Sequence, residues 1–125
     1  MTSPTQRTLK FLRAAGMICA VTEHWNPHAK IRQDLFGFID VLAMSVNLGP
    51  LDSVTGLLAV QTTSGTNHAA RRTKIFSLPA AKQWLLLGNR IWVVSWSKRG
   101  ERGKRKLWEP RIDSIHIGDF DEQAA

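Results

Sequence analysis

The sequence predicts a single α/β domain in which helices flank a mixed sheet of about five strands. Three observations support this fold class. The chain has 125 residues, of which 43 % are hydrophobic, so it is long enough to bury one hydrophobic core. Short apolar runs rich in β-branched and aromatic residues alternate with segments of helical periodicity. Along the chain the predicted order is a helix, three strands, one or two helices and two further strands.

The first helix is predicted over residues 2–16. Thr2 and Ser3 can cap its start, Pro4 suits its first turn and Gly16 can end it. Basic residues recur at every third position and lie opposite an apolar stripe. We therefore expect this helix to pack on the core with its charges facing outward.

The next part of the chain predicts three strands. A short apolar run at 17–21 is the first of them, and the apolar runs at 35–44 and 57–63 are the second and third. A loop rich in turn-forming residues, 47–53, separates the last two runs and suits an antiparallel connection. We expect residues 35–64 to form the hairpin around which the chain is organised.

Two polar residues interrupt this hairpin. Asp40 lies within the first apolar run and Gln61 lies near the end of the second. A carboxylate inside an apolar strand is costly unless it is paired or binds a metal, and hard cations such as Mg²⁺ prefer carboxylate and amide oxygens. Glu23 is a candidate second carboxylate, and Asp34 has the even spacing that would place it on the same strand face as Asp40. The alternative is that Asp40 pairs with an arginine or caps a turn.

The remaining elements are a basic helix at 67–76, a helix at 79–87, an inner strand at 90–97, a flexible basic loop at 98–106, a last strand at 108–117 and an acidic tail from 119 to 125. Pro110 favours an edge position for the last strand, because proline cannot donate a ladder hydrogen bond. We expect the tail to be disordered. Thr63, Ser64 and Ser95 have no evident histidine and aspartate partners for nucleophilic catalysis.

The charge of the chain favours a nucleic-acid partner. The net charge is +7 and the isoelectric point is near 10.3, and the basic residues are clustered. The single cysteine, Cys19, excludes an intramolecular disulfide and fits an intracellular setting. No apolar stretch has the length of a transmembrane helix, and the N-terminus does not resemble a signal peptide, so we expect no membrane partner.

Several of these features together resemble the PD-(D/E)XK nuclease superfamily. Ile39-Asp40 stands where the motif has Pro-Asp, and Gln61-Thr62-Thr63 stands where it has an acid, any residue and a lysine. A short hairpin separates the two motifs and a basic helix follows them, as in that superfamily.

The likeness extends to the small phage and bacterial members of the superfamily. Glu23 resembles the extra glutamate of the archaeal Holliday-junction resolvase, and the likeness covers residues 8–96. It implies a restriction-endonuclease-like core over a single nuclease-like domain, 1–125. It also implies a Mg²⁺- or Mn²⁺-dependent endonuclease that hydrolyses phosphodiester bonds of DNA, including branched DNA, as a homodimer in the cytoplasm of a bacterial or phage-infected cell.

The resemblance also implies roles for individual residues. The implied catalytic residues are Glu23, Asp40, Gln61 and Thr63, and the implied metal ligands are Asp40, Gln61, Thr62 through its carbonyl and Glu23. The basic residues expected to bind nucleic acid are Arg32, Arg71, Arg72, Lys74, Lys98, Arg99, Arg102, Lys104 and Arg105.

The sequence departs from the motif at two positions. Gln61 supplies an amide in place of the second carboxylate, and Thr63 stands in place of the lysine. Arg71 or Lys74, on the following helix, can replace that lysine. The alternative function is therefore a catalytically weak or inactive nucleic-acid-binding domain on the same fold. A module that binds an acidic protein partner is a third interpretation.

Overall fold

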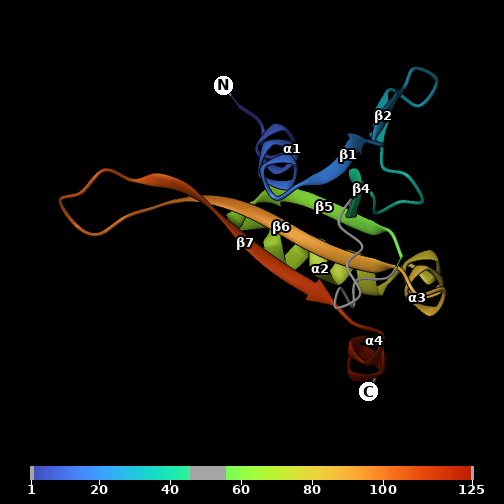
Figure 1. Ribbon diagram of the computed structural model, residues 1–125. Helices are drawn as coiled ribbons and strands as arrows, with labels where there is room; N and C mark the ends of the chain where they lie inside the picture. Colours follow the sequence, from blue (N-terminus) through green and yellow to red (C-terminus); the bar gives the residue numbers. More distant parts are fainter. Residues whose placement is uncertain (1, 46–55, 125) are drawn as a thin grey trace.

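The computed structural model describes residues 2–45 and 56–124, and it contains a five-stranded mixed sheet with helices on both faces (Figure 1). The strands of this sheet are β1 (Met17–Val21), β4 (Val41–Ser45), β5 (Leu58–Ser64), β6 (Arg90–Arg99) and β7 (Leu107–Ile115), and β2 (His24–Asn26) and β3 (Ile31–Gln33) form a separate hairpin. The helices are α1 (Pro4–Ala14), η1 (Gly65–Asn67, a 3₁₀ turn), α2 (His68–Phe76), α3 (Pro79–Leu86) and α4 (Ile117–Ala124). None of the described helices is long and apolar enough to cross a membrane.

The strand order is β1-β4-β5-β6-β7, which confirms the predicted α/β class with a mixed sheet. β4 and β5 are antiparallel, as expected for the central hairpin. β5 and β6 are parallel, because α2 and α3 form the crossover that a parallel pair requires. β6 lies inside the sheet and β7 at its edge, so both of those predictions are confirmed.

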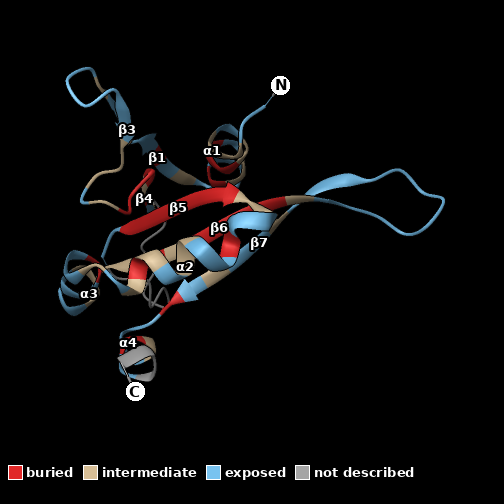
Figure 2. Cartoon of the chain, turned by 180° about the vertical axis from the view of Figure 1, so that it is seen from behind, coloured by how far each residue is buried: buried red, intermediate tan, exposed pale blue. Residues whose placement is uncertain are grey.

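The core has two layers, one on each face of the sheet. On one face, α1 packs Leu9 and Leu12 against alternate residues of β4, β5 and β6. On the other face, Ile75 of α2 and Ala81 of α3 pack against the intervening residues of β5 and β6. Figure 2 shows β5 buried along nearly its whole length, as expected for a strand covered on both faces.

The first helix forms as its capping residues predict. Ser3 has an extended backbone, and its side chain accepts a hydrogen bond from the Gln6 amide at 3.2 Å. Pro4 is the first helical residue, and Gly16 follows the helix with a positive φ of 88°, which glycine adopts without strain.

The predicted strand at 35–44 is only partly correct. Residues 35–39 form a tight turn in which Phe36 and Gly37 have positive φ angles of 55° and 85°, and β4 begins at Val41. An extended strand does not accommodate these angles. Phe38 and Ile39 are nevertheless fully buried, so the apolar run reflects core packing and not strand structure. The predicted loop at 47–53 lies outside the described residues.

Two other segments differ from the expectation. The polar segment before Asp34 contains β2 and β3, joined by a turn that includes Pro27. The acidic segment from Asp119, expected to be a disordered tail, belongs to helix α4. Phe120 of this helix is buried and packs edge-on against Phe76 of α2, with 5.0 Å between ring centroids. The buried ring of Phe120 therefore packs α4 against the domain.

Candidate functional site

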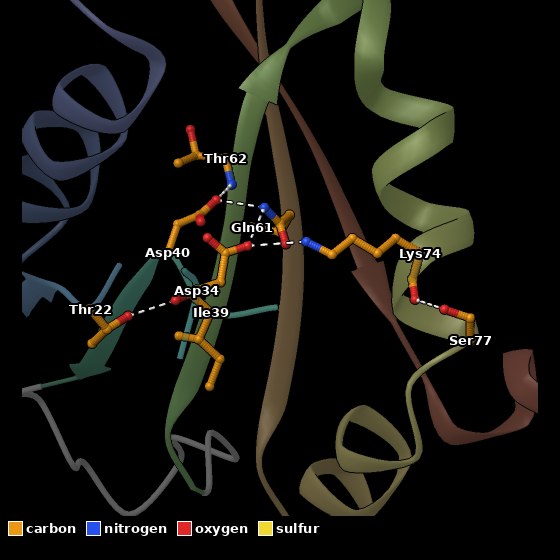
Figure 3. Close-up of polar contacts among 8 residues, drawn as sticks. All are labelled: Thr22, Asp34, Ile39, Asp40, Gln61, Thr62, Lys74 and Ser77. Atoms are coloured by element: carbon orange, nitrogen blue, oxygen red, sulfur yellow. Dashed lines mark hydrogen bonds and ion pairs between the residues drawn. The ribbon is translucent and has the colours of Figure 1, made fainter. Parts of the chain in front are cut away.

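The pairing of β4 with β5 brings Asp40 and Gln61 together. Val41 is opposite Val60, and the Asp40 amide donates to the Val60 carbonyl at 3.0 Å, so the next residues along the two strands meet. The Gln61 side-chain amide donates to Asp40 Oδ2 at 2.6 Å, and the Thr62 backbone amide donates to the same oxygen at 2.8 Å. Figure 3 shows these contacts. Asp40 is thus held between a side-chain and a backbone donor.

Asp34 is a residue of this site that the sequence-based assignment omitted. The turn between Leu35 and Ile39 closes on itself through two backbone hydrogen bonds of 3.1 and 3.0 Å. This turn brings Asp34 beside Asp40, where its Oδ2 lies 3.2 Å from Lys74 Nζ and 3.5 Å from the Gln61 side-chain nitrogen (Figure 3). The even spacing of the two aspartates was a valid signal, although a turn and not a regular strand places them together.

Glu23 completes a group of three acidic side chains. It lies between β1 and β2, and one ligand oxygen from each of Glu23, Asp34 and Asp40 lies within 4.8 Å of the others. Arg32 of β3 lies 3.7 Å from Glu23. The unpredicted β2–β3 hairpin therefore supplies a cation beside the acidic group.

These residues line a cleft of about 750 Å³. The acidic group and Gln61 lie among three cations, Arg32, Arg71 and Lys74, and Phe36 and Leu78 supply apolar parts of the wall. Two of the cations, Arg71 and Lys74, come from α2 and the third from β3. A cleft with acidic ligands and neighbouring cations can accept a metal ion together with a negatively charged substrate.

The pKa values of Asp40 and Asp34 are shifted in opposite directions. Burial, followed by the hydrogen bond shared with Asp34, raises the pKa of Asp40 from 3.8 to about 8, and the charges of Asp34 and Glu23 act in the same direction. Burial opposes the ionised form of Asp34 too, but its bond with Asp40 and the nearby Lys74 ammonium outweigh burial and lower its pKa. Near neutral pH the metal-free pair thus holds a proton on Asp40 and a charge on Asp34.

A buried oxygen of Gln61 bears on whether the site fits a metal ion. Its side chain is 1 % exposed, and its Oε1 atom has no hydrogen-bond partner among the described residues. A buried acceptor without a partner is unusual in a folded protein. Magnesium and manganese accept amide oxygens as well as carboxylates, so the side chains present fit a divalent cation.

The remaining predicted ligand and catalytic residues occupy different surroundings. Thr62 lines the cleft, and its hydroxyl lies 2.9 Å from that of Thr8 on α1. Thr63 is buried in β5 and is not among the residues that line the cleft. It is therefore Lys74, and not a group at position 63, that brings an amine to the carboxylates.

The predicted nucleic-acid-binding residues fall into three groups. Arg32, Arg71 and Lys74 line the cleft. Arg72 forms ion pairs with Asp113 at 3.0 Å and with Asp119 at 4.0 Å. The others lie at the far end of β6 and in the loop after it, and they are exposed: Lys98, Arg99, Arg102, Lys104 and Arg105.

Contrary to expectation, Ser95 does have histidine and aspartate partners. His68 Nδ1 lies 2.6 Å from Ser95 Oγ, and His68 Nε2 lies 3.2 Å from Asp113 Oδ2. Ser95 and His68 are each only 2 % exposed, so a substrate cannot reach the hydroxyl. This set ties α2 to β6 and β7 and has a structural role.

Comparison with known proteins gives no match to a family model, to a curated protein or to a solved structure. The function is therefore inferred from the cleft itself.

Proposed function

We propose that this protein is a Mg²⁺- or Mn²⁺-dependent endonuclease that hydrolyses phosphodiester bonds of DNA. The observation that carries the proposal is the cleft in which three carboxylates, the buried side-chain amide of Gln61 and the Lys74 ammonium meet. The restriction-endonuclease-like core belongs to the same proposal, and it rests on the resemblance of the two motifs around Asp40 and Gln61.

The metal ligands in this proposal are Glu23, Asp34, Asp40 and Gln61 through Oε1. A bound divalent cation would polarise a phosphoryl oxygen and lower the pKa of an attacking water. Gln61 must turn its amide to present Oε1, because its nitrogen faces Asp40 and Asp34 in the metal-free site. Asp40 must also lose its proton, since only the ionised carboxylate is a strong ligand.

Lys74 takes the part that the motif assigns to a lysine at position 63. Its ammonium lies next to Asp34 and its side chain is 38 % exposed, so Lys74 can contact both the acidic group and a substrate. A cation there stabilises the negative charge that develops on the phosphoryl oxygens. Arg71 and Arg32, also in the cleft, are placed to hold the adjacent phosphates.

The net charge of +7 favours a polyanionic substrate over a small phosphoester. Branched DNA is the substrate that the resolvase resemblance favours, and symmetric cleavage of two strands requires two copies of the chain. A symmetric homodimer is therefore part of the proposal, and sedimentation equilibrium would contradict it by giving the mass of one chain.

A nicking assay on linear, supercoiled and branched DNA, with Mg²⁺ or with EDTA, tests the activity. The wild-type chain should cleave only with metal. Asp40→Asn keeps the size of the side chain but removes the ionised ligand, so cleavage should fall by at least a hundredfold, on the order of a lost catalytic group. Asp121→Asn, at an exposed position of α4, removes the same charge and should cleave as the parent does. Equal cleavage by the Asp40 variant would refute the site.

The second candidate function is a nucleic-acid-binding domain without catalysis. One observation favours it: the Gln61 amide donates to both aspartates and thereby satisfies part of their charge without a metal. DNA binding that is unaffected by EDTA, together with no heat of Mg²⁺ or Mn²⁺ binding in a calorimetric titration, would favour this function over hydrolysis.

A further inference from the structure

The strands β6 and β7 continue beyond the sheet as a two-stranded arm, which we define as residues 97–109. β5 pairs with β6 only as far as Trp96, whereas β6 and β7 stay paired out to Arg99 and Leu107. Figures 1 and 2 show the arm projecting from the body, away from α3 and the β2–β3 hairpin. Residues 98–109 are all exposed, so the arm has no core of its own.

The root of the arm is fixed to the body. The Trp96 indole donates to Thr8 of α1 at 2.9 Å. Two residues further out, Lys98 and Trp108 are opposite each other across the ribbon, and the Arg7 guanidinium of α1 lies 4.1 Å from the Trp108 ring centroid. The Lys98 ammonium lies 5.5 Å from the same centroid. These cation–π contacts hold the arm in one direction and gather positive charge at its base.

The cations of the arm outnumber its acidic residues. Residues 98–106 contain six cations and one acidic residue, and the cations are Lys98, Arg99, Arg102, Lys104, Arg105 and Lys106. Among the described residues, Lys104 alone of these six has an acidic partner, Glu101 at 3.4 Å. Side chains alternate between the faces of a ribbon, so Lys98 and Arg99 present charge on opposite faces.

We propose that this arm inserts into the major groove of B-form duplex DNA and contacts the phosphates on both sides of the groove. The choice of DNA as ligand rests on the proposed function, but the arm needs neither the metal nor the cleft. Cations on both faces suit a groove, in which each face of the ribbon meets one phosphate backbone. A flat acidic surface would meet only one face.

The shape of the arm favours DNA over RNA. The major groove of B-form DNA is about 12 Å wide and admits a two-stranded ribbon. The major groove of A-form RNA is too narrow for side chains to enter. Binding that depends on the arm should therefore be specific for B-form duplexes.

The test compares two variants that lose the same charge. Arg105→Ala with Lys106→Ala removes two cations near the tip, and Lys30→Ala with Lys82→Ala removes two exposed cations elsewhere. Binding of the full-length chain to a 20-base-pair DNA is measured in EDTA over a range of salt. The arm variant should bind roughly tenfold or more weakly at 0.1 M salt, and its slope of log affinity against log salt should fall by about two units. The control variant should keep the slope.

Each further result supports or overturns the proposal. For duplex RNA of the same base sequence, the arm variant and the wild-type chain should have equal affinity. If the arm variant instead lost as much affinity for RNA as for DNA, groove insertion would be overturned. Equal DNA binding by the arm and control variants would overturn the arm as a contact. Thermal unfolding of both variants checks that they are folded. Since no metal is present, a negative result here leaves the nicking assay on Asp40→Asn unaffected, and the reverse also holds.

Discussion

In the proposed metal site, Gln61 is the side chain that would set how strongly a divalent cation is held. A glutamine oxygen is a ligand of Mg²⁺ but brings no charge, and the amide nitrogen of the same side chain competes by donating to Asp40 at 2.6 Å. The side-chain oxygen of Gln61, Oε1, is buried and has no hydrogen-bond partner among the described residues, so it could ligate a cation if the amide turned. A bound cation would therefore favour the opposite orientation of the Gln61 amide from the one in which its nitrogen donates to Asp40.

Replacing Gln61 with glutamate should shift this balance toward the metal. Gln61→Glu adds a ligand charge and removes the competing donor, so we expect Mg²⁺ to bind at least about tenfold more tightly, which corresponds to about 1.4 kcal/mol. In EDTA the same variant should unfold at a lower temperature, because it adds a fourth carboxylate beside Glu23, Asp34 and Asp40. Calorimetric titration and thermal unfolding measure the two effects.

Gln83→Glu is the matched control, because it makes the same change at an exposed position of α3. It should alter neither metal affinity nor thermal stability measurably. If Gln61→Glu also left the Mg²⁺ affinity unchanged, position 61 would not be a ligand.

At the scale of the elements, α1 is tied to the sheet by a buried hydroxyl. Thr8 Oγ1 accepts the Trp96 indole N–H at 2.9 Å and lies 2.9 Å from the Thr62 hydroxyl. Thr8 is fully buried, so its hydroxyl has no access to water. Because the Thr62 amide also donates to Asp40, this network connects the packing of α1 with the residues of the cleft.

Thr8→Val should destabilise the domain through this network. Valine fills the same volume but leaves the Trp96 N–H without an acceptor, so the free energy of unfolding should fall by about 1–3 kcal/mol. Thr5→Val makes the same change on the same helix at a less buried position, and it should cost less. Urea unfolding of the two variants makes the comparison, and equal losses would show that the network contributes nothing.

At the scale of the whole molecule, the charge of the cleft opposes the stability of the metal-free fold. The pKa of Asp40 is raised to about 8 by burial and by Asp34, while its ordinary value is 3.8. Between these two pH values the folded chain binds a proton that the unfolded chain has lost. Stability due to this group is therefore greatest at low pH and decreases as the pH rises toward 8.

We expect the free energy of unfolding in EDTA to decrease between pH 5 and pH 8 by up to about 1.4 kcal/mol per pH unit from this group. The lowered pKa of Asp34 acts at more acidic pH, where its stabilising charge is lost as the pH falls. Asp40→Asn cannot titrate, so its profile should be flatter across the same range. Identical profiles for this variant and the parent in urea unfolding would contradict the shift.

Much of the architecture follows from local patterns. The first helix was predicted from its cap at Ser3, and the central strands β5 and β6 from their β-branched runs. The edge position of β7 was predicted from Pro110. The turn at 35–39 was not predicted, because Leu35, Phe38 and Ile39 are apolar for reasons of packing, which a turn can satisfy as well as a strand. The tail helix was missed because Phe120, which packs it on the domain, is one apolar residue in an acidic segment.

The sequence by itself determined the fold class, the basic character of the chain and the pairing of Asp40 with Gln61. This pairing could be predicted because two antiparallel strands joined by one loop can place a polar residue of each strand, here Asp40 and Gln61, next to each other. Only the tertiary structure decided that Asp34 joins the acidic group and that Lys74, not position 63, supplies the amine. It also decided that the Gln61 oxygen has no partner among the residues that the structure describes. These facts depend on contacts between residues as many as 40 positions apart. Such contacts depend on the directions in which side chains point from the turn at 35–39 and from helix α2. No local sequence pattern encodes these directions.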